Sequence, residues 1–127
     1  MIVAVTAIRE DLLDGTKERI ADQSRGILTK DSLTFRETAP YEGKDTISFQ
    51  NQEFHLHHIG ETESILELKP NQEGSAEVRS PYGTMRMKAM LIHGNWAANE
   101  VLIEYRILEE AECVSHIRFL IQITDLS

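Results

Sequence analysis

Apolar and polar residues alternate with a period of two along most of the chain. Side chains of a β-strand point alternately to its two faces, so each such segment presents one apolar face to a core. Beyond the N-terminal loop, no stretch shows the sustained period of about 3.6 residues that marks an amphipathic helix. The pattern therefore predicts an all-β chain. Residues 2–8 are apolar on both faces, as in a strand buried on two sides, and the alternating segments are residues 33–36, 47–49, 54–57, 84–91, 101–107 and 117–124.

Turn signals separate these segments at short intervals. Ser80-Pro81-Tyr82-Gly83 has the residue order of a type I turn, and Asp14-Gly15 and Gly94-Asn95 are further turn candidates. Such frequent turns predict a meander of consecutive antiparallel strands, closed as a barrel or folded as a sandwich. Residues 17–28 are too polar to assign by alternation alone. Because no repeat or linker interrupts the chain, we expect one domain over residues 1–127.

Composition agrees with a small globular domain and limits its compartment. The chain has 127 residues, of which 41% are hydrophobic, and single domains peak at roughly 100–150 residues. No apolar run approaches the roughly 18 residues of a membrane-spanning helix, and the N-terminus lacks the basic start of a signal peptide. A lone cysteine, Cys113, suits a reducing compartment. These features predict a cytoplasmic protein.

The charge balance disfavours two classes of partner. Thirteen Lys and Arg residues against 21 Asp and Glu residues give a formal net charge of -8. Nucleic-acid binders concentrate positive charge to displace counterions from phosphates, and anionic membranes attract polybasic segments. The basic residues here are scattered. We therefore expect neither nucleic acid nor membrane as a partner.

Several segments, taken together and in order, resemble a known family. "SAEVRSPYGTMRMKA", "EVLIEYRI" and "VSHIRFLIQI" carry a Ser-Pro-Tyr-Gly turn, an acidic-Tyr pair at Glu104-Tyr105 and a Ser-His-Ile-Arg segment at residues 115–118. With "GILTKDSLTFRE" and "FHLHHIGE" upstream, the chain resembles the bacterial YwiB-like family over roughly residues 2–125. The segment at residues 93–96 departs from the family pattern, because it is shorter there.

The resemblance implies a fold without an activity. It implies a lipocalin-like or calycin-like β-barrel, which we expect to have about eight to ten strands, in a bacterial protein of a family without known function. It supplies no catalytic residue and no cofactor, and we predict none. The sequence also lacks nucleophile-elbow, phosphate-loop and zinc-protease motifs.

The densest candidate chemistry is "FHLHHIGE", at residues 54–61. On a strand, His55 and His57 share a face at a spacing that zinc or copper can use, although a third ligand is needed from elsewhere. Glu63, Glu67 and His58 are candidates. Phe54 and Leu56 would take the core face and leave the two histidines in solvent, so a surface role is favoured over a metal site.

A second set of candidates depends on which way the last strand faces. His116 and Arg118 alternate with apolar residues, so they point to solvent if the apolar set fills the barrel, and inward if the lumen is polar. Tyrosines can present a donor from an apolar wall, and methionines provide an adaptable lining, although ordinary core packing is favoured for the methionines. The candidate ligand-binding residues are Tyr82, Met85, Met87, Tyr105, His116 and Arg118.

Three function classes stay open. The leading hypothesis is a non-catalytic module that binds a small apolar or amphipathic molecule in the mouth of the barrel. The alternative is an interaction protein with a filled core, such as a homodimer formed through an open strand edge or an exposed apolar face, with Trp96 as a candidate contact. The third is an enzyme, using a metal at His55 and His57 or acting through His116, and it is the least favoured.

Overall fold

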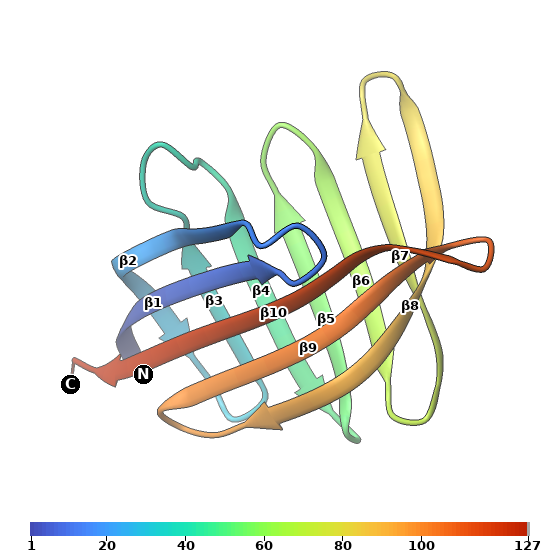
Figure 1. The fold of residues 1–127 in the computed structure, drawn as a ribbon. Coiled ribbons are helices and arrows are strands. Elements are labelled where there is room, and N and C mark those ends of the chain that lie inside the picture. The colour runs from blue at the N-terminus through green and yellow to red at the C-terminus, as the bar shows by residue number, and fades with distance from the viewer. Residues whose placement is uncertain (127) are drawn as a thin grey trace.

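The computed structural model describes residues 1–126, and within them the chain forms ten antiparallel strands and no helix (Figure 1). No helix that could cross a membrane is therefore found among the described residues. The strands are β1 (Ile2–Asp11), β2 (Lys17–Leu28), β3 (Ser32–Arg36), β4 (Lys44–Gln50), β5 (Glu53–Ile59), β6 (Glu63–Lys69), β7 (Gln72–Ser80), β8 (Gly83–Trp96), β9 (Glu100–Glu109) and β10 (Glu112–Asp125).

The strands form one closed barrel. Each strand pairs with the next in the sequence, and β10 returns to pair with β1 from Val3–Asp125 to Asp11–Ile117. The predicted all-β meander is thus confirmed, and of the two predicted architectures the barrel is observed. Closure leaves no free sheet edge in residues 1–126, so the homodimer, which stays a prediction, would have to use an exposed face.

The polar segment that alternation could not assign, residues 17–28, is strand β2. It hydrogen-bonds to β1 on one side and to β3 on the other. Its register shifts opposite Thr6, where Gln23 has a positive φ of 50°. This irregularity breaks the alternation and explains why the sequence pattern is weak there.

The inner face of the barrel carries the core. Val3, Val5 and Ala7 on β1 and Val101 and Ile103 on β9 are fully buried. The same phase on β8 places Met87 and Ala89 inside, as the alternation predicts. The buried residues come from all ten described strands, as expected for one shared core.

The two ends of the barrel differ. At one end, here called the aromatic end, the Phe49 ring lies 4.7 Å from that of Phe54 and stacks on Trp96 at 5.8 Å. Both chain termini lie at this end (Figure 1). The opposite end, here called the polar end, carries the loops at residues 12–16, 37–43, 60–62, 81–82 and 110–111.

The structure corrects one predicted turn. The turn predicted at Ser80-Pro81-Tyr82-Gly83 is the β7–β8 hairpin, but the turn predicted at Gly94-Asn95 is wrong, because both residues lie inside β8. Gly94 is needed there for packing rather than for turning, since a Cβ would run into the Phe54 ring. Trp96, expected as an exposed contact, is half-buried against Phe49.

Candidate functional site

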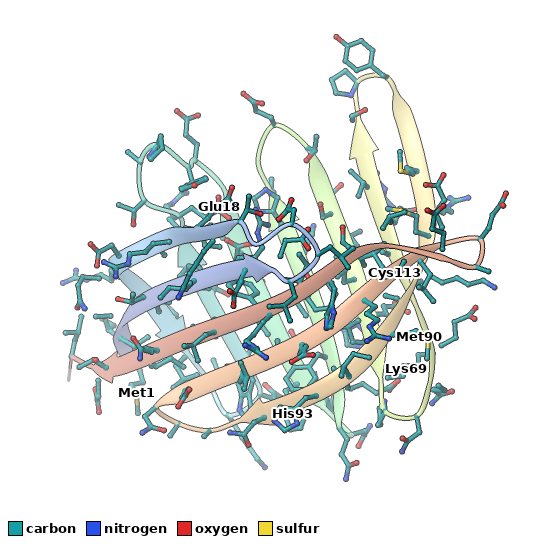
Figure 2. All side chains as sticks on the ribbon, in the orientation of Figure 1. Met1, Glu18, Lys69, Met90, His93 and Cys113 are labelled. Carbon is teal, nitrogen blue, oxygen red and sulfur yellow. The ribbon has the colours of Figure 1, made fainter. Side chains whose placement is uncertain are left out.

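Polar and ionisable side chains occupy inward positions near the polar end of the barrel. They stand where the alternating pattern of each strand would place another apolar residue: Arg9 continues the phase of Val5 and Ala7, and His58 that of Phe54 and Leu56. The full set of side chains is drawn in Figure 2, with Glu18 labelled on β2. The inward polar residues are Arg9, Glu18, Glu37, Asp45, His58 and Tyr105.

Arg9 and Glu18 form an ion pair across neighbouring strands. They are register partners on β1 and β2, and the Arg9 Nη2 donates to Glu18 Oε2 at 3.0 Å. The Tyr105 side chain lies beside them in the wall and is almost fully buried. Burial raises the pKa of Tyr105 to about 12, although the positive charge of Arg9 opposes the shift. Tyr105 is therefore a neutral phenol at physiological pH.

A cavity of about 360 Å³ opens beside this pair at the polar end. Apolar side chains from five strands form most of its wall, and Arg9, Glu18 and Tyr105 supply polar groups. A lining of this kind, mainly apolar with a few polar groups, is typical of small-molecule sites. The apolar lining residues are Leu66, Ala76, Val78, Met87, Ile107, Val114 and Ile117.

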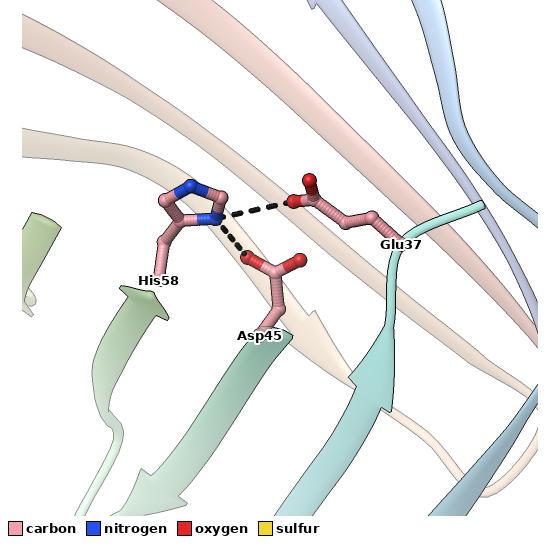
Figure 3. A group of neighbouring side chains, drawn as sticks. All are labelled: Glu37, Asp45 and His58. Atoms are coloured by element: carbon pink, nitrogen blue, oxygen red, sulfur yellow. Dashed lines mark hydrogen bonds and ion pairs between the residues drawn. The ribbon is translucent and has the colours of Figure 1, made fainter. Parts of the chain in front are cut away.

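A second polar group joins Glu37, Asp45 and His58 (Figure 3). His58 Nδ1 lies 3.1 Å from Glu37 Oε2 and 3.1 Å from Asp45 Oδ1. The two carboxylate side chains are only 7% and 11% exposed, and the histidine 30%. The other oxygen of Glu37 accepts a hydrogen bond from the Gly43 N–H at 3.1 Å, which holds that carboxylate in place.

Asp45 is the electrostatically unusual member of this group. Its Oδ2 is buried and has no hydrogen-bond partner among the described residues. Burial, and then the adjacent Glu37 carboxylate, raise the pKa of Asp45 to about 8, against the opposing charge of Arg9. A buried carboxylate oxygen without a donor is costly, so this position favours a proton or a bound cation.

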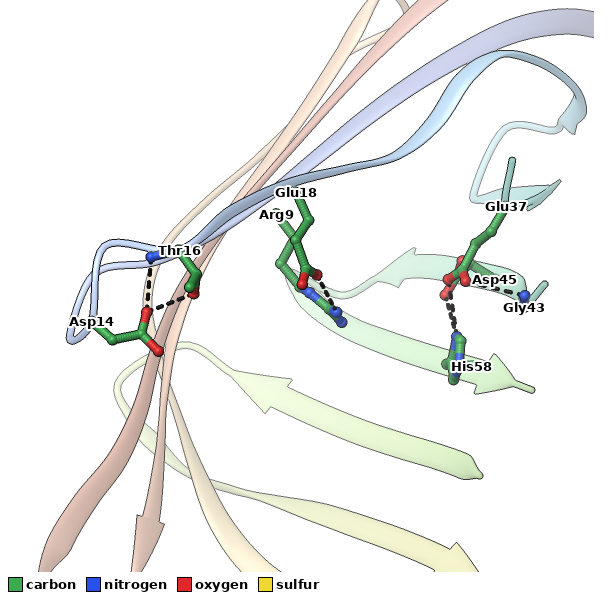
Figure 4. Close-up of polar contacts among 8 residues, drawn as sticks. All are labelled: Arg9, Asp14, Thr16, Glu18, Glu37, Gly43, Asp45 and His58. Atoms are coloured by element: carbon green, nitrogen blue, oxygen red, sulfur yellow. Dashed lines mark hydrogen bonds and ion pairs between the residues drawn. The ribbon is translucent and has the colours of Figure 1, made fainter. Parts of the chain in front are cut away.

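Two spaces adjoin the group. A cavity of about 130 Å³ inside the barrel touches Asp45 and His58 and reaches Arg9. A surface hollow of about 430 Å³, lined by the loops at residues 37–43 and 60–62, touches Glu37 and His58. Figure 4 shows the Arg9–Glu18 pair and the Glu37, Asp45 and His58 group as two separate polar clusters.

The ligand-binding residues predicted from the sequence fall into three places. Met87 and Tyr105 line the 360 Å³ cavity, whereas Tyr82 is fully exposed on the β7–β8 hairpin and Met85 is 55% exposed. On β10 the apolar side chains point into the barrel. His116 and Arg118 therefore point outward, which is one of the two orientations predicted for them. His116 and Arg118 both bind Glu104 on the outer face, at 2.9 Å and 3.4 Å.

The two predicted metal ligands lie on the outer face of β5. His57 Nε2 is 2.6 Å from Glu63 Oε2, and His55 lies between Ser48 and Glu67 in the sheet register. The structure brings neither into a group of three ligand atoms among the described residues. Metal binding at His55 and His57 stays a prediction.

Sequence reasoning passed over most of the inward polar residues. A usable signal existed, because Arg9, Asp45 and His58 each extend an apolar phase toward one end of a strand. An ionisable residue at the end of an inward-facing apolar series has either a solvent-exposed side chain at the rim of the barrel or a side chain in an interior polar group. The pattern of one strand cannot separate these two cases.

Comparisons with known proteins agree with this architecture. The sequence model of the family described as "Domain of unknown function (DUF1934)" matches residues 5–121. The chain belongs to this family. The crystal structure of the ywiB protein from Bacillus subtilis superposes with a TM-score of 0.66 and 15% sequence identity, covering 99% of this chain and 91% of that one. The family model and this structure together confirm the resemblance to the YwiB-like family, and the structural likeness itself, at 15% identity, shows the fold alone. No curated protein matches the sequence.

Proposed function

We propose that this DUF1934 barrel binds a small amphipathic molecule in the cavity at its polar end. The observation that carries the proposal is the 360 Å³ cavity, whose wall is mostly apolar and whose polar lining includes Arg9, Glu18 and Tyr105 together with Asp11, Thr16 and Ser115. A ligand with an apolar body and a polar end matches both parts of this lining. We include in this proposal that the barrel is of the lipocalin-like or calycin-like kind that the sequence resemblance implies, since barrels of that kind can hold one small ligand.

The polar groups favour a ligand whose polar end accepts hydrogen bonds. Arg9 carries five N–H donors and gives one described hydrogen bond, to Glu18. The Tyr105 phenol keeps its proton at physiological pH, because burial raises its pKa to about 12. A carboxylate, sulfonate or carbonyl group would therefore meet donors at this end of the cavity. A binding role in the bacterial cytoplasm is part of the proposal, supported by the lone cysteine.

The test uses anilinonaphthalene sulfonate, an amphipathic anion that fluoresces in apolar surroundings. We expect saturable binding to the folded protein and at least a tenfold weaker affinity for Met87→Trp, because the indole fills space that Met87 leaves in the wall. Met85→Trp makes the same change two residues nearer the β7–β8 hairpin, outside that cavity. This variant should bind anilinonaphthalene sulfonate with the affinity of the wild type. Equal affinities for the two variants would overturn the proposal.

A ligand carried through purification gives a second test. Native mass spectrometry of protein purified without a metal-affinity step should show an organic adduct above the 14.5 kDa chain. The adduct should be absent from Met87→Trp and present in Met85→Trp. An adduct that persists in Met87→Trp would place the ligand elsewhere.

A further inference from the structure

The two separations between His58 and the carboxyl oxygens of Glu37 and Asp45 match those of ligands around one metal ion. Two donor atoms bound to one cation at about 2.1 Å, with angles between tetrahedral and octahedral, lie roughly 3.0–3.4 Å apart. His58 Nδ1 lies 3.1 Å from an oxygen of each carboxylate, and one ligand atom from each of the three residues falls within 4.8 Å of the others. The three donors therefore need little rearrangement to share an ion.

A second observation points independently to an occupant. Asp45 is 8% exposed, yet its Oδ2 has no hydrogen-bond donor among the described residues. Its carboxyl group is directed toward Glu37 and His58 (Figure 3). The cation in the same interior, Arg9, is paired with Glu18 instead. Two neighbouring buried carboxyl groups thus share one imidazole, and a divalent cation that displaces the proton of Asp45 would supply positive charge to both.

The surrounding chain is shaped to leave room at the histidine. A Cβ at Gly43 would strike the His58 ring and the Glu37 carboxylate, and a Cβ at Gly60 would approach His58 Nε2 to 3.0 Å. The Gly43 N–H also fixes Glu37 Oε1, which leaves Oε2 directed at His58. Hydrogen bonds that orient a ligating carboxylate in this way are usual around metal ions.

We infer that Glu37, Asp45 and His58 form a binding site for one divalent transition-metal cation of the Zn²⁺ or Mn²⁺ type. The donor set decides the class, because an imidazole nitrogen with two carboxylate oxygens suits these ions better than Mg²⁺, Ca²⁺ or Cu⁺. The surface hollow beside Glu37 and His58 gives the ion a route from solvent, and the interior cavity leaves space for a further small ligand on it. This site is separate from the amphipathic-ligand cavity, which contains none of the three residues.

Calorimetric titration of chelator-treated protein with Zn²⁺ tests the inference. We expect one Zn²⁺ per chain, no comparable binding of Mg²⁺, and at least a tenfold weaker Zn²⁺ affinity for Asp45→Asn and for His58→Gln. His55→Gln and His57→Gln are matched controls on the same strand, with side chains on the outer face, and should bind Zn²⁺ like the wild type. Absence of Zn²⁺ binding, or loss of binding in a control rather than in Asp45→Asn, would overturn the inference.

A measurement on the wild-type protein covers the case in which the variants do not fold. Mn²⁺ broadens the nuclear magnetic resonance signals of nearby protons, so substoichiometric Mn²⁺ should remove the ring signals of His58 before those of His55 and His57. Earlier loss of the His55 or His57 signals would move the metal to the outer face and overturn the inference. Anilinonaphthalene sulfonate binding is unaffected by either outcome, so failure of this site and failure of the proposed function are distinguishable.

Discussion

Gly94 of β8 lies against the ring of Phe54 from β5, a strand that is not its neighbour in the barrel. A side chain at residue 94 would overlap the ring, which is 1% exposed and in contact with Phe49. Gly94 and Phe54 also line a surface hollow of about 420 Å³ at the aromatic end. Residue 94 therefore has room for a glycine, but not for a larger side chain unless the Phe54 ring moves.

Replacing this glycine should loosen the aromatic end. We expect Gly94→Ala to lower the free energy of unfolding by about 1–3 kcal/mol, because the Phe54 ring must move within a packed layer. Urea denaturation measures the change, with Asn95→Ala as the control at the next, exposed position. In a Phe54→Leu background the cost of Gly94→Ala should shrink, and an undiminished cost would show that the clash is not with the ring.

A second glycine is required by the backbone itself. A Cβ on Gly74 of β7 would fall on the carbonyl oxygen of Glu67 in β6, where the register between the two strands shifts. No rotamer change relieves a clash with backbone, so we expect Gly74→Ala to cost about 3 kcal/mol of unfolding free energy. Ser75→Ala, exposed on the same strand, should change it by no more than about 0.5 kcal/mol. Similar thermal stability of the two variants would contradict the prediction.

The outer pair of His116 and Glu104 should make stability depend on acid pH. The hydrogen bond from His116, followed by the charge of Arg118, lowers the pKa of Glu104 below its ordinary value of 4.5. A lowered carboxyl pKa contributes stability above the unfolded-state value and loses it as the pH falls through the folded-state value. Glu104→Gln should therefore cost about 0.5–1 kcal/mol above pH 4.5 and progressively less below it.

Chemical denaturation across this acid range measures the Glu104 effect. Glu10→Gln is the control, because Glu10 meets Arg118 only at 3.9 Å. A destabilisation by Glu104→Gln that stays constant as the pH falls would mean that packing, and not the carboxylate charge, accounts for it.

Tyr105 should make the free energy of unfolding decrease at alkaline pH. Burial raises its pKa from the ordinary 10.0 to about 12, so the folded protein keeps a proton that the unfolded chain releases. A raised tyrosine pKa means that stability falls as the pH rises from 10.0 toward 12. Tyr105→Phe should remove this loss, and Tyr82→Phe, at a fully exposed position, should keep it. The prediction fails if tyrosinate absorbance shows that Tyr105 ionises together with exposed Tyr82.

The sequence alone determined most of the strands, because local alternation and turn chemistry mark them, but the polar strand β2 could not be assigned from its own pattern. The apolar phases at Val101–Ile107 and Met85–Leu91 reappear as the inner faces of β9 and β8, and the turn at Ser80–Gly83 reappears as a hairpin. Met87 and Tyr105, two of the ligand-binding residues predicted from the sequence, line the cavity, and their binding of a ligand stays a prediction. The sequence pattern failed at Gly94, where the requirement comes from Phe54, some forty residues away in the sequence.

Only the tertiary structure decided what the barrel encloses. The pairing of β1 with β2 places Arg9 opposite Glu18, and closure between β1 and β10 brings Arg9 into one cavity wall with Tyr105 of β9. The pairing of β4 with β5 places Asp45 opposite His58. Alternation shows which residues of one strand share a face. It does not show the register between strands, nor the curvature of the sheet that turns this face toward the inside of the barrel. Arg9 meets Glu18, and Asp45 meets His58, because backbone hydrogen bonds fix the strands at set offsets. Those offsets are properties of the paired strands in the sheet rather than of any single segment.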